Sequence, residues 1–192
     1  MNKSALGESR INDREAIRDA LYRWCRGIDR KDWPVARSAF HPDAYDNHGS
    51  YRGDIEGLIT WVNERHQTIV SSLHHIGNIL IEFAGPDQAV VESYVIARQR
   101  QAAGCAQETR IALLGAEQAL AEGEIEVTVA GRYVDIFRRY DGRWVIYDRC
   151  TVTDSVCAEL VPPGLPVDPA RNIAQRDRTD PLYEQRAKVG LD

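Results

Sequence analysis

Residues 73–100, LHHIGNILIEFAGPDQAVVESYVIARQR, decide the fold of this chain. Two runs rich in β-branched residues, roughly 73–84 and 88–100, flank the turn Ala84-Gly85-Pro86-Asp87. Such runs are typical of strands, and a turn this short places the two strands side by side and antiparallel. The stretch therefore predicts a pair of long antiparallel strands.

The same pattern continues toward the C-terminus. Runs over 124–140 and 143–153 flank a second turn, Tyr140-Asp141-Gly142-Arg143, and extend the predicted antiparallel sheet. Residues 101–123 interrupt the pattern with three glycines around a short apolar stretch. We expect a long loop with a helical turn beside the sheet, of the kind that often serves as a lid or a subunit contact.

Helices are expected before these strands. Asn12 and Glu15 fit a capping box, and an apolar stripe at helical spacing follows them. The stripe consists of Ile17, Leu21, Trp24 and Ile28. The expected elements of this part are a helix over about 13–30, a short helix from Trp33 to near Phe40, a strand and turn over 44–53, and a helix capped by Asp54.

This order of elements predicts an α+β fold in which a curled antiparallel sheet forms a cone closed by the N-terminal helices. Such a cone encloses a pocket suited to a small apolar ligand. We expect a flexible arm over residues 1–11 and one α+β domain over 12–154. Residues 155–192 contain five prolines and predict an extended tail that wraps a neighbouring surface.

Composition excludes several classes of protein. The net charge of −5 argues against nucleic acid as a partner, and no apolar run is long enough to cross a membrane. The first residues lack the pattern of a signal peptide, so we expect a cytoplasmic protein. None of the four cysteines lies in a CxxC pair, and no His/Cys cluster has zinc spacing, so we expect no metal site. Proton abstraction by side chains, the chemistry that the candidate residues suggest, needs no organic cofactor either.

Asp29, His74 and Arg149 form the strongest candidate for chemistry. Asp29 ends the first helix at the margin of its apolar stripe, and His74 and His75 begin a strand, on which only one of the two faces the pocket. Arg149 lies in the last strand, where alternation places it on one face with Val145 and Tyr147. A carboxylate can fix the tautomer of an imidazole base, and an arginine can balance the negative charge that forms.

Each of these residues also has a structural interpretation. Asp29 can be a solvated helix-end acid, the histidines can be edge residues, and Arg149 can lie on the outer face. Further candidates are aromatic or polar side chains within the predicted helix and strands. They are Trp24, Tyr45, His48, His75, Tyr94 and Tyr133, for which core packing or a surface rim is the alternative to substrate binding.

Four stretches resemble the SnoaL-like domain proteins of the nuclear-transport-factor-two-like superfamily, over about residues 10–154. These stretches are CRGIDRKDW (25–33), FHPDAYDNHGSYRG (40–53), HHIGN (74–78) and FRRYDGRWVIYDR (137–149). Members include hexachlorocyclohexane dehydrochlorinase, scytalone dehydratase and the bile-acid dehydratases. The resemblance implies a cystatin-like α+β barrel that assembles as a homotrimer.

The resemblance also implies site residues. Dehydrochlorinase-type members use an Asp in a Gly-hydrophobic-Asp setting, which is Asp29 here, and an Arg in the last strand, which is Arg149. They use a His four residues before a polar strand residue, which is His74, whereas a rival alignment selects His75. Their Lys five residues before the Asp is Trp24 here, so the leaving-group contact is not preserved.

We therefore expect a cofactor-independent lyase that eliminates water or a comparable group from a cyclic, aromatic or steroid-like substrate. His74 removes the proton, Asp29 orients His74, Arg149 balances charge, and Tyr45 and His48 are candidates to bind the substrate's oxygen. An isomerase using the same pair is the nearest alternative. A non-catalytic small subunit of an aromatic-ring dioxygenase and a ligand-binding module are the others.

Overall fold

The computed structural model describes residues 3–161, 168 and 170–191 of the chain. In chain order the elements are α1 (Lys3–Arg30), α2 (Trp33–Arg37), β1 (Phe40–Asn47), β2 (Arg52–Asp54), α3 (Ile55–Arg65), β3 (Ile69–Phe83), β4 (Gln88–Gln101), α4 (Gln107–Leu114), the 3-10 helix η1 (Gln118–Leu120), β5 (Ile125–Tyr140), β6 (Arg143–Leu160) and α5 (Pro181–Lys188).

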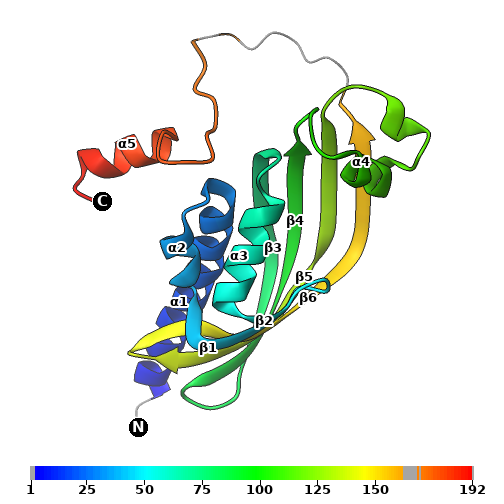
Figure 1. Cartoon of the computed structure of the whole chain (residues 1–192). Coiled ribbons are helices and arrows are strands. Elements are labelled where there is room, and N and C mark those ends of the chain that lie inside the picture. The colour runs from blue at the N-terminus through cyan, green and yellow to red at the C-terminus, as the bar shows by residue number, and fades with distance from the viewer. Residues whose placement is uncertain (1–2, 162–167, 169, 192) are drawn as a thin grey trace.

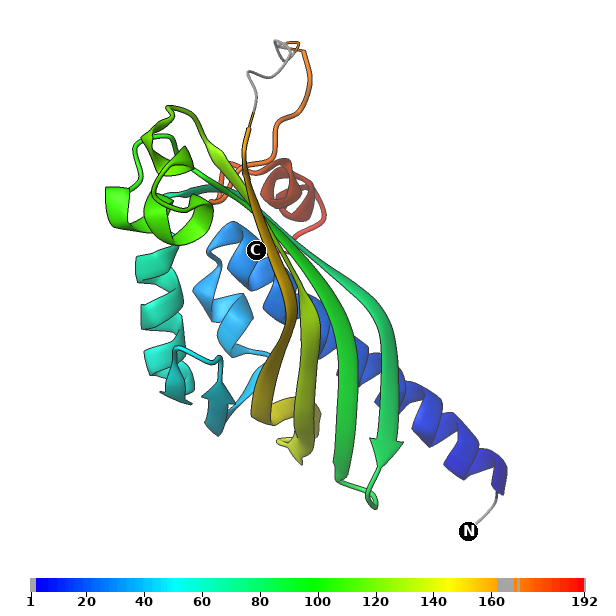
Figure 2. The same cartoon turned by 90° about the vertical axis from the view of Figure 1, so that its right-hand side faces the viewer.

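The strands form one sheet in the order β2-β1-β6-β5-β4-β3. The long strands curve around α1, α2 and α3, which cover one face of the sheet (Figures 1 and 2). This confirms the predicted α+β fold with a curled sheet, although within the described residues the two outer strands do not pair to close a barrel. One pair, β1–β6, is parallel rather than antiparallel, because a long connection and not a tight turn joins these strands.

Helix α1 begins earlier than the sequence predicted. It starts at Lys3, so the expected arm over residues 1–11 is helical from that residue onward, and Asn12 lies inside the helix rather than capping it. The stretch KSALGESRI (3–11) is rich in good helix formers and contains no proline, so the helix extends backward through it. Asp13 then ties the helix to the sheet, accepting hydrogen bonds from Trp144 Nε1 (2.9 Å) and Arg139 Nη2 (2.7 Å).

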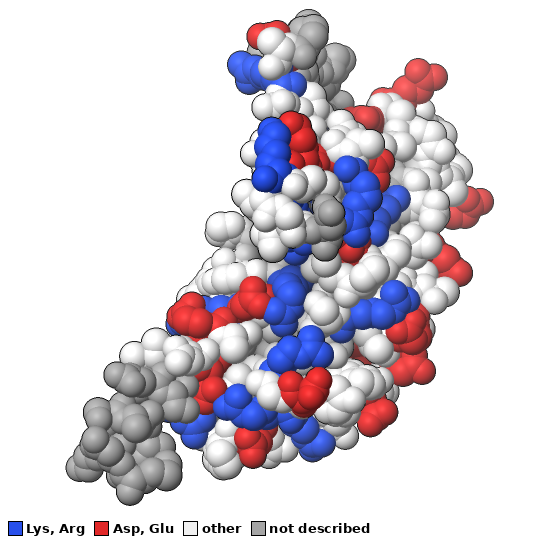
Figure 3. All heavy atoms as spheres, turned by 90° about the vertical axis from the view of Figure 1, so that its left-hand side faces the viewer, with Lys and Arg blue, Asp and Glu red and all other residues white. Residues whose placement is uncertain are grey.

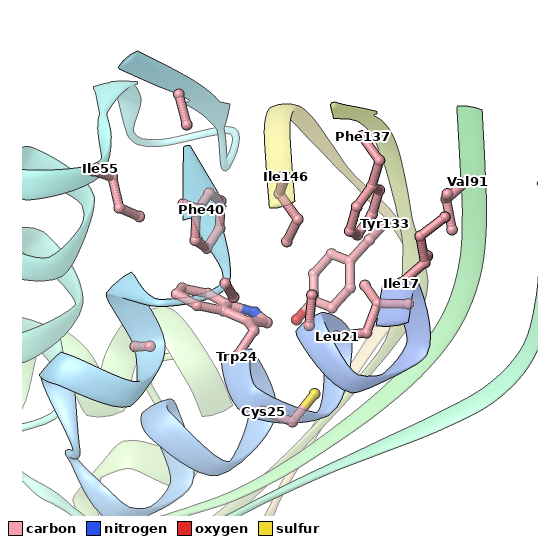
Figure 4. Close-up of a cluster of buried hydrophobic side chains, with 14 of the residues drawn as sticks. Ile17, Leu21, Trp24, Cys25, Phe40, Ile55, Val91, Tyr133, Phe137 and Ile146 are labelled. Carbon is pink, nitrogen blue, oxygen red and sulfur yellow. The ribbon is translucent and has the colours of Figure 1, made fainter. Parts of the chain in front are cut away.

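The predicted apolar stripe of α1 is confirmed as the centre of the core. Trp24 meets Phe40 edge to face, with ring centroids 5.2 Å apart, and Figure 4 shows its indole nitrogen directed toward the Tyr133 hydroxyl. Gly27 allows α2 to approach α1, because a Cβ there would lie 2.5 Å from the backbone nitrogen of Ala36. The buried members include Ile17, Leu21, Trp24, Ile28, Phe40, Val91, Tyr133, Phe137, Trp144 and Ile146.

The C-terminal segment is more regular than the predicted extended tail. Strand β6 continues to Leu160, because β5 supplies a pairing partner as far as Ile125↔Leu160. The prolines of the tail that fall at 162, 163, 166 and 169 lie outside the described residues. Helix α5 then returns to the end of α1, where Tyr183 Oη donates to Asp32 Oδ2 at 2.8 Å.

The insertion at 101–123 carries α4 and η1, and packs beside the far ends of β5 and β6 (Figure 1). Buried Arg110 holds this segment together by donating to the backbone carbonyls of Ala103, Ala119, Ala121 and Gly123. On the face shown in Figure 3, the basic and acidic side chains are interspersed. No helix in the described residues is long and apolar enough to cross a membrane.

Candidate active site

Asp29 and His74 are in direct contact. Asp29 lies in the last turn of α1, with only 6% of its surface exposed, beside the edge strand β3. Its Oδ1 lies 2.7 Å from His74 Nδ1 and accepts from Ser72 Oγ at 2.8 Å, while its Oδ2 accepts from the His74 backbone N–H at 2.9 Å. The predicted pair is therefore formed, and Asp29 contacts both the ring and the backbone N–H of His74.

The charge on Asp29 determines which nitrogen of His74 carries the proton. Burial on its own raises the pKa of Asp29, but the hydrogen bonds and charge of His74, with the Ser72 hydroxyl, outweigh it and lower the pKa below 3.8. Asp29 is thus a carboxylate at neutral pH and only accepts hydrogen bonds. Neutral His74 must then carry its proton on Nδ1, which leaves Nε2 free as an acceptor or base.

The alternation of β3 selects His74 over His75. Ser72 is buried and the His74 side chain is 8% exposed, whereas Leu73 and His75 are exposed on the opposite face of the strand. The rival alignment that chose His75 as the base is not supported by this geometry, because His75 points away from Asp29.

His74 lines a cavity of about 360 Å³ between the sheet, α1 and α3. The walls combine apolar and polar side chains in nearly equal measure. Apolar lining residues include Trp24, Ile28, Trp61, Val62, Val95, Leu113, Val127, Val129 and Tyr133, and polar ones include His48, Arg65, His66, His74, Gln99, Gln101 and Thr151. A cavity of this size with apolar walls and several polar groups suits a small organic molecule.

Three of the predicted substrate-binding residues line this cavity and three do not. Trp24, His48 and Tyr133 contribute to the wall as predicted. Tyr45 and Tyr94 do not, with exposed fractions of 46% and 44%, and neither does His75. Strand alternation explains the failures, because buried residues on either side of each tyrosine take the inward positions.

His48 belongs to a second aspartate–histidine pair. Its Nδ1 lies 3.1 Å from Oδ1 of Asp46, which is 1% exposed, and 3.2 Å from Thr151 Oγ1. The ring packs against Trp61 with centroids 5.7 Å apart. The cavity is therefore lined by two imidazoles whose Nδ1 atoms are each held by a buried carboxylate.

Arg149 faces inward as predicted, but it does not line the cavity. It is completely buried and forms two hydrogen bonds to Asp135, from Nε to Oδ1 (2.8 Å) and from Nη2 to Oδ2 (2.7 Å). Burial alone would lower the pKa of Arg149, but the charge and hydrogen bonds of Asp135 raise it. The guanidinium stacks 4.0 Å from the centroid of the Tyr133 ring, so it supports the cavity wall from behind.

The predicted partners of Arg149 on its strand face were wrong. The β5–β6 register shifts between Ile136 and Phe137, so that Phe137 pairs with Ile146 while Asp135 pairs with Arg149. Tyr147 is the extra residue of this bulge, and Ile146 rather than Tyr147 shares the inward face with Arg149.

The sequence did not single out His66 or Gln99, which also line the cavity. His66 is the C-terminal cap of α3, and no motif surrounds it. Cys25 lies close to Asp29 but stays a thiol, because burial and the charge of Asp29 raise its pKa to about 12. In the described part of the chain, no group of three or more His, Cys, Asp or Glu residues could hold a metal ion.

The sequence model of the SnoaL-like domain family matches residues 9–149, which span α1 to Arg149 and include Asp29 and His74. A search of curated protein sequences finds no significant match.

Solved structures with the same fold include several bacterial proteins. A candidate scytalone dehydratase from Novosphingobium aromaticivorans matches with a TM-score of 0.64 and 17% identity, over 86% of this chain and 99% of that one. A hexachlorocyclohexane dehydrochlorinase from Novosphingobium barchaimii matches with a TM-score of 0.64 and 19% identity, over 82% and 99%. A candidate aromatic ring hydroxylase from Novosphingobium aromaticivorans matches with a TM-score of 0.60 and 19% identity, over 78% and 94%. At these identities the likeness shows the shared fold.

Proposed function

This chain belongs to the SnoaL-like domain family, and from that premise we propose that it is a cofactor-independent lyase with an Asp29–His74 pair as general base. The observation that carries the proposal is the 2.7 Å contact between Asp29 Oδ1 and His74 Nδ1 at the wall of the cavity. The reaction is elimination of water or a comparable group from a cyclic, largely apolar substrate.

Proton abstraction is the first part of the proposed step. His74 Nε2 takes a proton from a substrate carbon, and the electron pair of that C–H bond forms a C=C bond as the neighbouring C–O bond breaks. The carboxylate of Asp29 stabilises the imidazolium that results, since its charge and hydrogen bond both favour the protonated ring. His74 then returns the proton to solvent.

Departure of the oxygen is the second part. We assign it to His48, which as an imidazolium donates its Nε2 proton to the leaving hydroxyl while the buried carboxylate of Asp46 balances the charge. The presence of this second histidine favours elimination over isomerisation, because an isomerase needs only one base that returns the proton to another carbon. Arg149 is assigned as a positioning residue for Tyr133, not as a contact to substrate.

The experiment is a screen of cyclic β-hydroxyketones of one to four rings, in which elimination is followed by the ultraviolet absorbance of the conjugated product. For an active compound, Asp29→Asn and His74→Ala each lower kcat by about 10²–10⁴-fold, the usual contribution of a general base. His75→Ala is the matched control and leaves kcat unchanged, because His75 lies on the opposite face.

Two other functions are outcomes of the same experiment. A non-catalytic dioxygenase subunit or a ligand-binding module would eliminate nothing, and Asp29→Asn would leave ligand affinity almost unchanged. Activity that survives His74→Ala would sink the assignment of the base while keeping the enzyme.

We also propose that copies of this chain associate, as a homotrimer, through the outer face of the sheet. Exposed apolar side chains gather there on neighbouring strands, and such patches mark interfaces. They include Val90, Tyr94 and Ile96 of β4 and Ile136 of β5. Light scattering with size-exclusion chromatography tests this, with Ile96→Glu expected to dissociate the assembly. A wild-type monomer at micromolar concentration would contradict it.

A further inference from the structure

His66 is a buried imidazole in the candidate cavity that the proposed reaction does not use. It caps the end of α3, is 5% exposed and lines the same cavity as His74 and Gln99. Its Nε2 lies 3.4 Å from the terminal nitrogen position of the Gln99 side chain. A buried polar ring at this place in the wall has a defined orientation only if a neighbouring group fixes it.

Arg176 of the C-terminal segment fixes it. Arg176 Nη2 donates to His66 Nδ1 at 2.8 Å. The same guanidinium donates to the carbonyl oxygens of Ile28 (2.9 Å), Asp29 (3.1 Å) and Ile69 (2.8 Å). One side chain thus binds the free carbonyls at the end of α1, the start of the edge strand β3 and the imidazole.

This contact determines the tautomer of His66. A guanidinium is only a donor, so His66 Nδ1 must accept and neutral His66 must carry its proton on Nε2. That N–H faces the Gln99 side chain, so the amide oxygen of Gln99 and not its nitrogen belongs at the 3.4 Å position. The Gln99 NH₂ group is then available to the cavity.

We propose that Arg176 is a positioning residue that holds His66 as its Nε2–H tautomer, and that His66 thereby orients Gln99 so that the Gln99 NH₂ group is a hydrogen-bond donor to an oxygen of the substrate. The inference rests on the proposed function only in taking this cavity as the substrate site. The two imidazoles are then held in opposite ways: Nδ1 of His74 faces the acceptor Asp29, whereas Nδ1 of His66 accepts from Arg176.

The electrostatics of the site keep His66 neutral. Burial is the largest effect and lowers the pKa of His66 to about 3, and the positive charges of Arg176, protonated His74, Arg65 and Lys31 act in the same direction. His66 therefore stays uncharged through the neutral range.

The chemistry of such donors names a substrate class. A fixed N–H group stabilises negative charge as it forms on a carbonyl oxygen, which is the charge that develops when a base removes the proton beside that carbonyl. The structure thus assigns a cyclic ketone, or a compound with an equivalent carbonyl next to the acidic C–H bond, as the substrate class.

Histidine tautomers in the full-length protein test the first half of this proposal. Two-bond ¹⁵N–¹H correlation spectra at pH 5–8 should show wild-type His66 as the Nε2–H tautomer without titration. Arg176→Gln should abolish the fixed tautomer, so that the His66 nitrogen signals average between the two neutral tautomers. Arg178→Gln is the matched control, because Arg178 lies in the same segment with a 66% exposed side chain and contacts Asp32 instead.

The wild-type spectrum tests the Nε2–H tautomer of His66 even if Arg176→Gln disturbs folding. A wild-type His66 that carries its proton on Nδ1, or that titrates near about 6.5 as a free imidazole does, overturns the proposal. So does a folded Arg176→Gln protein with an unchanged His66 signal. These outcomes do not depend on catalysis, so they are distinguishable from failure of the elimination assay.

Ligand binding tests the second half. The probes are 2-tetralone and its hydrocarbon analogue tetralin, titrated by NMR into wild-type and His66→Phe protein. His66→Phe removes the group that orients Gln99, so we expect it to weaken 2-tetralone binding about tenfold, the usual effect of one hydrogen bond, and to leave tetralin binding unchanged. Equal losses for both probes would mean that His66 only shapes the wall and would refute its role in orienting the Gln99 donor.

Discussion

The buried pair of Asp135 and Arg149 predicts a large loss of stability for a single isosteric change. Both side chains are fully buried and joined by two hydrogen bonds of 2.8 and 2.7 Å. Asp135→Asn keeps the shape of the side chain but leaves the Arg149 charge without its carboxylate. The expected loss of stability in Asp135→Asn therefore comes from an unpaired buried cation and not from a cavity.

The magnitude comes from the geometry. Two charge-assisted hydrogen bonds contribute about 1.5–3 kcal/mol each, and breaking a buried pair by removing one partner costs about 3–5 kcal/mol. The charge of Asp46 also acts favourably on Arg149, which places the expected loss toward the lower end. We expect Asp135→Asn to lower the free energy of unfolding by about 3–4 kcal/mol, measured by urea denaturation at pH 7.

A matched control is available on the surface. Arg37 and Glu56 form the same two-bond fork, at 2.6 and 2.7 Å, with side chains 41% and 64% exposed. Glu56→Gln should cost less than about 1 kcal/mol, since water replaces the lost partner. An equal or smaller loss of unfolding free energy for Asp135→Asn than for Glu56→Gln would mean that the buried Arg149 does not depend on its carboxylate partner, and would refute the prediction.

Three further changes test other parts of the structure. The pKa of Asp29 in the folded protein lies below 3.8, so its contribution to stability is present above that pH and is lost as the pH falls through the folded-state pKa. The difference in unfolding free energy between wild type and Asp29→Asn should therefore shrink below about pH 4. Urea titrations at several pH values would measure it. Gly27→Ala should cost about 1–3 kcal/mol of unfolding free energy, because its Cβ would lie 2.5 Å from Ala36 N, and a thermal melt that is unchanged would contradict this close approach. Tyr183→Phe removes the 2.8 Å hydrogen bond to Asp32 and should speed proteolysis of the C-terminal segment while the rest of the chain stays protected; equal cleavage in both proteins would mean that this bond does not hold the segment.

The elements that the sequence predicted well are those defined by local patterns. The stripe of α1 and the turns around Gly85 and Gly142 follow from periodicity and turn chemistry, and the strands on either side of each turn pair as expected. The start of α1 and the end of β6 were misplaced, because both depend on neighbours. Residues 155–160 are strand only because β5 lies alongside them, and nothing in their own sequence marks a boundary.

The residues of the candidate site also separate into those that local sequence patterns indicate and those that depend on distant neighbours. Helix and strand periodicity placed Asp29 and the two histidines near the pocket, but the choice of Asp29 with His74 came from the resemblance to the SnoaL-like family, and the structure brings these two side chains together. Asp135 and Arg176 could not be predicted, because each acts on a residue that only the folded chain brings near it. The bulge at Tyr147 also has no sequence signal, and it reversed the expected face of every residue before it on β6.

The edge of the sheet explains why the candidate site forms where it does. β3 is an outer strand of the sheet, so backbone groups on its free side need partners from elsewhere. The His74 N–H finds Asp29 Oδ2, and the Ile69 carbonyl finds Arg176 Nη1. These same two side chains, Asp29 and Arg176, also contact the two imidazoles. Asp29 and Arg176 therefore both complete the sheet edge and orient the histidines, so a substitution of either residue should disturb the backbone of β3 together with the tautomer of the histidine that it contacts.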